Sequence, residues 1–173
     1  KAYLEQISTD FDDSASLAFL EDKFQNKYIL ILVPGKTLNS QKDRISEYIK
    51  KYNPIIISVN FVPYDTPVDF VYMSNIRRYQ LWQNDAKFLH TRKIMTSNIV
   101  AGEFCQDAIV VSITRLLRNS KMLHSDNSTI LLLRLLAIIH CKDIAFAGFD
   151  GFSFGNDENF ENYAIEELEV ASV

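Results

Sequence analysis

An apolar run that ends in a glycine turn constrains the fold of this chain more than any other feature. Residues 28–33 read YILILV, and PGKT follows at 34–37. Because the run shows no polar alternation, it predicts a parallel β-strand that is covered on both faces. Residues 40–51 carry apolar side chains at helical spacing and predict a helix. A strand, a turn and a helix place backbone N–H groups at a helix N-terminus, where an anion is stabilised.

The turn itself offers three groups to such an anion. Gly35 allows close approach of the backbone, Lys36 carries a mobile positive charge and Thr37 adds a hydroxyl. We therefore expect a phosphate at this turn. The pattern is not the NTPase phosphate loop, because the first glycine of that motif would fall on Leu30.

Strands and helices are predicted to alternate along the rest of the chain. This alternation is typical of an α/β protein, and it predicts a three-layer Rossmann-like domain with a mostly parallel central sheet. The first helix is expected over 14–23, after a solvated linker with Asp13 or Ser14 as its cap. Residues 115–125 are expected to be irregular. Further strands are expected over 55–60, 68–73, 88–97, 108–113 and 143–149, and further helices over 76–83, 130–141 and 159–170.

Small polar residues follow the predicted strands. In an open parallel sheet these positions share one edge, and ligands bind there. We therefore predict a polar ligand site at this edge, although the same residue types also suit turns and caps. The candidate residues are Gly35, Lys36, Thr37, Asn60, Ser74, Asn75, Ser97, Asn98 and Asp150, together with Asn127 and Ser128 at a helix start. Asn and Ser suit bases and sugar hydroxyls, and the turn suits phosphate.

Composition and charge exclude several classes of function. The 173 residues carry a net charge of −4, which argues against a general nucleic-acid or anionic-membrane surface. No apolar run is long enough to cross a membrane, and we expect a cytoplasmic protein. Cys105 and Cys141 have no CxxC spacing, so they are interpreted as buried thiols rather than metal ligands.

Catalytic residues cannot be assigned from the sequence. There is no GxSxG elbow and no plausible Ser/His/Asp set. Asp69, Asp150 and Asp157 could act as acids or bases, but no spacing pairs them. Arg77 and Arg78 could bind a second phosphate or simply begin a solvated helix. Whether this domain is an enzyme stays open.

Four segments together resemble a known family. They are residues 30–39 (LILVPGKTLN), 58–79 (SVNFVPYDTPVDFVYMSNIRRY), 126–136 (DNSTILLLRLL) and 142–152 (KDIAFAGFDGF). They resemble the C-terminal domain that follows the barrel in bacterial HMG-CoA-lyase-like and 4-hydroxy-2-oxovalerate-aldolase-like proteins. The resemblance implies that residues 1–13 are a linker from a barrel and that 14–173 form a Rossmann-like ligand-binding domain. It also implies that the lyase chemistry and its metal belong to the barrel.

A more distant similarity is to bacterial sialyltransferases and the related motility-accessory (MAF-like) proteins. In those proteins a glycine turn and two asparagines hold a cytidine nucleotide, and the matching positions here are 34–37, Asn60 and Asn75. Their helix start matches residues 127–129, and their Gly-x-Asp strand end matches residues 148–150. Two departures argue against glycosyl transfer: Val33 replaces a glycine, and no histidine follows His140.

The sequence thus predicts an accessory domain of an aldolase-like protein that binds a nucleotide, a nucleotide-sugar or a phosphorylated sugar. The alternatives are a glycosyltransferase-like enzyme that uses a nucleotide-activated sugar, and a non-catalytic interaction or dimerisation module. We expect no metal and no cofactor other than this ligand in the domain. The expected partners are the ligand, an aldolase-like barrel of the same chain and a second copy of the chain, with no nucleic acid and no membrane.

Overall fold

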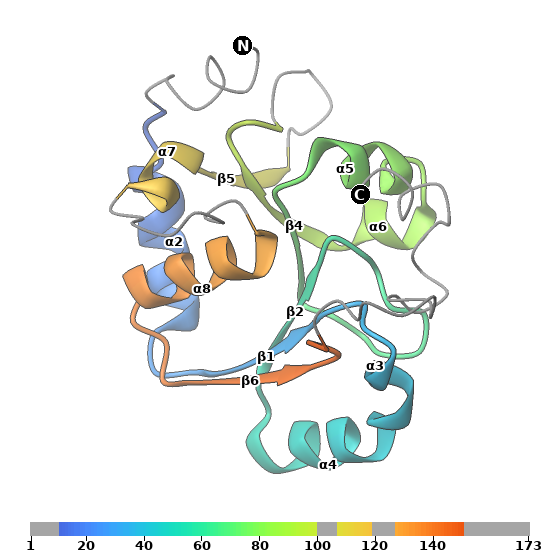
Figure 1. The fold of residues 1–173 in the computed structure, drawn as a ribbon. Helices are drawn as coiled ribbons and strands as arrows, with labels where there is room; N and C mark the ends of the chain where they lie inside the picture. Colours follow the sequence, from blue (N-terminus) through green and yellow to red (C-terminus); the bar gives the residue numbers. More distant parts are fainter. Residues whose placement is uncertain (1–10, 100–106, 119–126, 151–173) are drawn as a thin grey trace.

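The computed structural model describes residues 11–99, 107–118 and 127–150, and it contains a six-stranded parallel sheet (Figure 1). The strand order is β5-β4-β3-β2-β1-β6. Every neighbouring pair is parallel. The strands are β1 (Tyr28–Leu32), β2 (Ile55–Val59), β3 (Phe70–Met73), β4 (Arg92–Thr96), β5 (Ala108–Val111) and β6 (Asp143–Ala147). The predicted α/β Rossmann-like arrangement is therefore confirmed.

Helices cover both faces of the sheet (Figure 1). On one face lie α2 (Ser14–Phe24), α7 (Ile113–Leu117) and α8 (Ser128–Ile138). On the other lie α3 (Thr37–Ser40), α4 (Lys42–Tyr52), α5 (Ile76–Trp82) and α6 (Ala86–His90). Ile29 and Ile31 of β1 enter the first core, whereas Leu30 and Leu32 enter the second. Strand β1 shows no polar alternation because both of its faces are buried.

The strand order sets where a ligand can bind. The chain steps outward from β1 through β2, β3, β4 and β5, and then returns so that β6 pairs with the other side of β1. The direction in which the chain adds strands to the sheet therefore reverses between β1 and β6, although these two strands are parallel. In open α/β sheets, ligands bind outside the carboxyl ends of the strands near such a reversal.

Several predicted boundaries differ from the observed ones for local reasons. Strand β3 begins at Phe70 because Asp69 is used to bridge to β2: its carboxylate accepts the Ile56 N–H at 2.8 Å. The expected strand over 88–97 is preceded by α6, whose N-terminus is capped by the Asp85 carboxylate. Part of 115–125 is helical, because Ser112 caps α7. Residues 1–10 and the expected helix over 159–170 lie outside the described residues.

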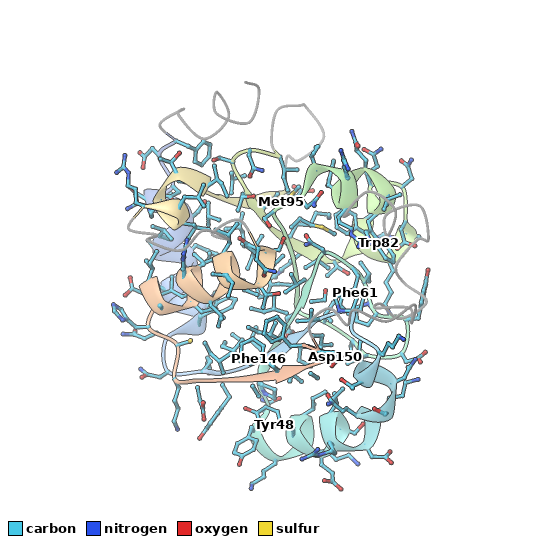
Figure 2. All side chains as sticks on the ribbon, in the orientation of Figure 1. Tyr48, Phe61, Trp82, Met95, Phe146 and Asp150 are labelled. Carbon is cyan, nitrogen blue, oxygen red and sulfur yellow. The ribbon has the colours of Figure 1, made fainter. Side chains whose placement is uncertain are left out.

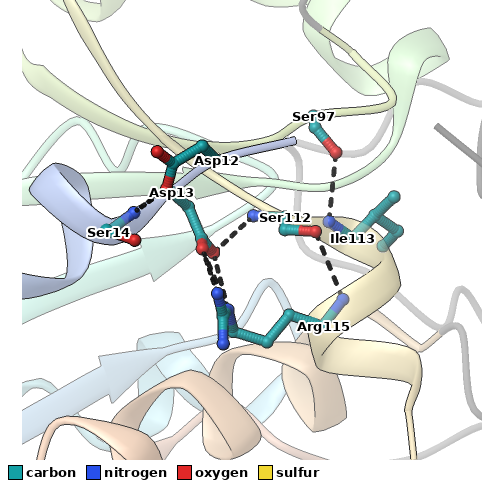
Figure 3. Close-up of polar contacts among 7 residues, drawn as sticks. All are labelled: Asp12, Asp13, Ser14, Ser97, Ser112, Ile113 and Arg115. Carbon is teal, nitrogen blue, oxygen red and sulfur yellow. Dashed lines mark hydrogen bonds and ion pairs between the residues drawn. The ribbon is translucent and has the colours of Figure 1, made fainter. Parts of the chain in front are cut away.

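The expectation of a solvated linker is wrong at Asp13. This side chain is only 1% exposed, and it does not cap α2. Its carboxylate accepts the Ser112 N–H at 2.9 Å and the Arg115 Nε–H at 2.9 Å, while Arg115 Nη2 lies 2.8 Å from Oδ1 (Figure 3). Asp13 therefore joins the start of α2 to the start of α7.

Asn53 ends α4 in the left-handed conformation, with φ of 44°. It is exposed, and its N–H donates to the Ile49 carbonyl at 2.9 Å. We expect Asn53→Ala to lower the free energy of unfolding by about 1 kcal/mol, because Ala is disfavoured at this φ. Asn53→Gly should keep or slightly raise it. Urea unfolding of both variants checks this, and equal stability of the two would contradict it.

Candidate functional site

Three of the predicted site residues meet above the carboxyl ends of β2 and β3. Asn60 follows β2, Ser74 follows β3 and Ser128 is the first residue of α8. The Asn60 amide Nδ2 donates to Ser128 Oγ at 2.7 Å, and Ser74 Oγ donates to Ser128 Oγ at 2.6 Å. Asn98 joins them, because its Nδ2 donates to the Ser74 carbonyl at 3.2 Å. We call Asn60, Ser74, Asn98 and Ser128 the serine–asparagine cluster.

Local backbone geometry explains why these residue types occupy these positions. Asn60 has φ of 62°, a left-handed conformation that asparagine tolerates better than most residues. Ser128 is positioned by Asn127, whose Oδ1 accepts the N–H groups of Thr129 at 2.9 Å and Ile130 at 3.3 Å. The N-cap therefore fixes the helix start, and the helix start brings the Ser128 hydroxyl to the two strand ends.

The cluster leaves buried oxygen atoms without a partner. Asn60 Oδ1 and Asn98 Oδ1 are shielded from solvent and accept no hydrogen bond from the described part of the chain. A buried acceptor in this state costs about 1–3 kcal/mol, so a ligand that donates to it would recover that free energy. A group that satisfies these two oxygens therefore has to donate hydrogen bonds.

Sequence reasoning missed two polar atoms in the strands below the cluster. The Tyr72 and Ser58 hydroxyls are fully buried and also lack a hydrogen-bond partner within the described ranges. Burial raises the pKa of the Tyr72 phenol far above its ordinary value. Tyr72 is therefore a neutral phenol at physiological pH. The sequence signal that could have revealed these two residues is a hydroxyl-bearing side chain inside an otherwise apolar strand.

The glycine turn forms a second group, which packs against the turn after β6. A Cβ atom on Gly35 would lie 2.2 Å from the Gly148 carbonyl oxygen and 2.6 Å from Asp150 Oδ2. A Cβ atom on Gly148, whose φ is 70°, would lie 2.1 Å from the Val33 carbonyl oxygen. Both positions therefore need glycine, because the two turns are in backbone contact.

The anion at this turn is the protein's own carboxylate. Asp150 lies just beyond β6 and beside α3 (Figures 1 and 2). Its Oδ2 accepts the Thr37 N–H at 2.7 Å, and its Oδ1 accepts the Thr37 hydroxyl. Lys36 is exposed. A phosphate at Thr37 would have to displace this carboxylate, so the phosphate-binding role of Gly35, Lys36 and Thr37 stays a prediction.

The remaining predicted site residues act as caps in this structure. Asn75 Oδ1 accepts the Arg77 N–H at 2.9 Å at the start of α5. Ser97 Oγ accepts the Ile113 N–H at 3.1 Å (Figure 3). Of the eleven candidates, four thus form the cluster and four (Gly35, Lys36, Thr37 and Asp150) lie at the turn, where Lys36 is exposed. Asn75, Ser97 and Asn127 position helices.

Comparisons with family models, with curated proteins and with solved structures gave no match. The geometry of the site therefore carries the functional argument.

The described residues contain neither a metal-ligand group nor a membrane-spanning helix. In the described ranges, no three His, Cys, Asp or Glu side chains come together as a metal site. Cys141 is half-buried, and burial raises the pKa of its thiol, whereas Cys105 lies outside the described residues. No helix in the described part of the chain is long and apolar enough to span a membrane.

Proposed function

We propose that this chain is an accessory domain of an aldolase-like protein, and that it binds a nucleotide, a nucleotide-sugar or a phosphorylated sugar at the carboxyl edge of its sheet. The observation that carries the proposal is the pair of buried amide oxygens, Asn60 Oδ1 and Asn98 Oδ1, that face no donor among the described residues. The association with a barrel comes from the sequence resemblance.

The cluster favours a ligand that donates hydrogen bonds. Asn98 Nδ2 faces the Ser74 carbonyl, which can only accept, so Oδ1 is the atom left for a ligand. Asn60 Nδ2 donates to the Ser128 hydroxyl, so Oδ1 is again the atom without a donor among the described residues. The hydroxyls of a sugar and the amino group of a base both supply such donors, and a base also brings a flat apolar face.

The phosphate of the ligand has two places close to this edge. Helix α8 has 11 residues and begins at Ser128. Its N-terminus therefore carries partial positive charge next to the cluster. The turn at Gly35 offers the exposed Lys36, together with the N–H that Asp150 now accepts. A ligand that binds the cluster through its base or sugar can direct its phosphate to either place.

A second candidate function is an interaction module, which exposed aromatic residues on an outer strand favour. Phe146 on β6 is 40% exposed, and Phe149 beyond it is 50% exposed. Their rings pack 5.6 Å apart, centroid to centroid. Strand β6 pairs with β1 alone among the described strands, and an outer strand of this kind can add a partner.

Thermal-shift and calorimetric titration with CMP, UDP, GDP-sugars and sugar phosphates test the proposal. We expect at least one of them to raise the melting temperature, because a ligand at a hundred times its dissociation constant adds about 2.7 kcal/mol of stability. If none does, the interaction module is favoured. If the domain alone hydrolyses or transfers a nucleotide-activated sugar, it is an enzyme of the glycosyltransferase-like kind.

The matched variant is Ser128→Ala. The Ser128 hydroxyl joins Asn60 to Ser74, so the loss of this hydroxyl should free both side chains. Binding of the tightest ligand should then weaken about tenfold, which corresponds to about 1.4 kcal/mol. Ser46→Ala on the exposed side of α4 is the control and should bind like the wild type. Equal affinity of the Ser128 and Ser46 variants would place the ligand elsewhere.

A further inference from the structure

Strand β6 lies at one border of the described sheet, with α8 on one face and α4 on the other (Figure 1). A hollow lies beside this strand on each face of the sheet. The α4 hollow has a volume of about 280 Å³, and the α8 hollow has a volume of about 440 Å³. From β6, the α4 hollow is lined by Ala145, Phe146 and Ala147, and the α8 hollow by Asp143 and Ile144.

The backbone of β6 turns alternate residues toward β1 and away from it. The Ala147 carbonyl accepts the Val33 N–H at 2.9 Å, so Ala147 faces β1. In a parallel ladder the next residue faces the opposite way, which places the Phe146 N–H and carbonyl on the outer side of β6. Ile144 also faces outward, and its N–H donates to Asp143 Oδ1 at 2.9 Å. The Phe146 backbone is therefore positioned to pair with an added strand.

Two ammonium groups lie near the beginning of β6. Lys51 Nζ is 4.9 Å from the centre of the Tyr52 ring, and Lys142 Nζ is 4.5 Å from the centre of the Tyr28 ring. The two rings are 4.9 Å apart, centroid to centroid, and Tyr48 packs on Tyr52 at 4.6 Å. We call these five residues the lysine–tyrosine patch. No ion pair among the described residues involves either lysine.

The two sides of β6 differ in charge. Burial and the negative charge of Asp143 both raise the pKa of the Tyr48 phenol, so one carboxylate lies close to the lysine–tyrosine patch. Against this carboxylate stand the two ammonium groups, and Arg44 lines the α4 hollow. The side toward α4 therefore favours acidic side chains. The side toward α8 is mostly apolar, because its helix contributes Leu133, Leu136, Ala137 and His140.

We propose that β6 adds an extended segment of a partner protein in which acidic and apolar side chains alternate. Successive side chains of a strand point to opposite faces, so the acidic set reaches the α4 side and the apolar set reaches the α8 hollow. Main-chain hydrogen bonds to Phe146 supply affinity, and the alternating side chains supply specificity. A second copy of β6 matches less well, because Asp143 is its one acidic side chain.

This inference rests on the second candidate function, the interaction module, and gives that module a partner. It does not depend on the ligand of the serine–asparagine cluster. The Ser128→Ala variant should therefore bind the partner segment like the wild type, even though the same variant should weaken the small-molecule ligand. Failure of one proposal can thus be told apart from failure of the other.

Titration of the full chain with the peptide acetyl-Glu-Val-Glu-Val-Glu-Val-amide tests the proposal by calorimetry and by NMR-detected hydrogen exchange. We expect saturable binding with a dissociation constant of about 1 mM or lower, weakened by added salt. At saturation the Phe146 N–H should exchange about tenfold more slowly, whereas the Ala147 N–H, which already faces β1, should not change. The same peptide with lysine in place of glutamate is the control and should not bind.

Variants of the chain assign the contacts. Lys51→Gln/Lys142→Gln should weaken binding of the glutamate peptide about fivefold, because two exposed charge pairs are lost. Lys50→Gln, at the exposed neighbouring position of α4, is the control and should have no effect. Phe146→Pro removes the outward N–H and should abolish binding, whereas Phe146→Ala keeps this N–H and should still bind. If Phe146→Pro does not fold, hydrogen exchange of the wild type decides.

Four results would overturn the proposal. The first is equal binding of the lysine peptide, and the second is a Phe146 N–H whose exchange the glutamate peptide leaves unchanged. The third is an equal loss of affinity for Lys50→Gln and for the double lysine variant. The fourth is slow exchange of the Phe146 N–H without peptide: if dilution of the chain removes it, a second copy covers β6, and if it persists, the chain covers β6 itself.

Discussion

Replacing Gly148 with alanine is expected to lower the free energy of unfolding by about 3 kcal/mol, combining the strain of a left-handed alanine with a steric clash. Gly148 has φ of 70°, and its new Cβ would lie 2.1 Å from the Val33 carbonyl oxygen. That oxygen belongs to the backbone after β1, and Val33 N–H in turn donates to the Ala147 carbonyl at 2.9 Å. The clash can therefore be relieved only by separating the β1 and β6 turns.

Urea unfolding measures this loss of stability, and two further variants separate backbone strain from the steric clash. Gly148→Asn keeps a residue that tolerates positive φ but still adds the Cβ, so it should retain most of the loss. Ala18→Gly, on the exposed side of α2, tests a glycine–alanine exchange without a clash and should cost at most about 1 kcal/mol. If Gly148→Asn is as stable as the wild type, backbone strain alone explains the effect and the close contact with Val33 is wrong.

Asp13→Ala is expected to lower the free energy of unfolding by about 2 to 3 kcal/mol, less than a fully buried ion pair would lose. The Asp13 side chain is only 1% exposed, but that of Arg115 is 45% exposed and can recover water. The larger part of the loss comes from the buried Ser112 N–H, which donates to the Asp13 carboxylate and loses this acceptor in the variant. The contact between the starts of α2 and α7 should also weaken when the Asp13 carboxylate is removed.

The control for Asp13 is Asp22→Ala. Asp22 pairs with Lys23 at the surface, where its side chain is 73% exposed, so its removal should change stability by less than about 0.5 kcal/mol. The double mutant Asp13→Ala/Arg115→Gln measures the coupling, which should exceed about 0.5 kcal/mol for residues in contact. A loss for Asp13→Ala that is no larger than for Asp22→Ala would remove Asp13 from any role in holding the helices together.

The fold could be predicted because burial on both faces leaves a direct mark on the sequence. Strands β1 and β2 are short apolar runs, and each feeds alternate residues into two cores. Asp13 could not be predicted, because a local pattern of two aspartates before a serine reads as a helix cap. Its partner Arg115 lies 102 positions away, and only the folded chain brings them together.

The candidate site could be predicted in part for a similar reason. That strand ends converge is a property of parallel sheets, so grouping Asn60 and Ser74 with Ser128 followed from topology. The hydrogen-bond partner of each polar group did not follow from the topology. Asn75 is a cap and Asp150 accepts from Thr37, and both facts depend on which neighbour lies closest once the turns are packed.

The position of β6 has a consequence for how the chain folds. β1 occurs early in the sequence, but one of its two sides is covered only by the last described strand, from Tyr28 opposite Asp143 to Leu32 opposite Ala147. During synthesis, β1 can pair with β2 long before β6 exists, and its other side stays unprotected in the meantime. Contacts between such distant segments form slowly, so a ribosome-bound chain that stops short of β6 presents a bare apolar strand to any neighbour.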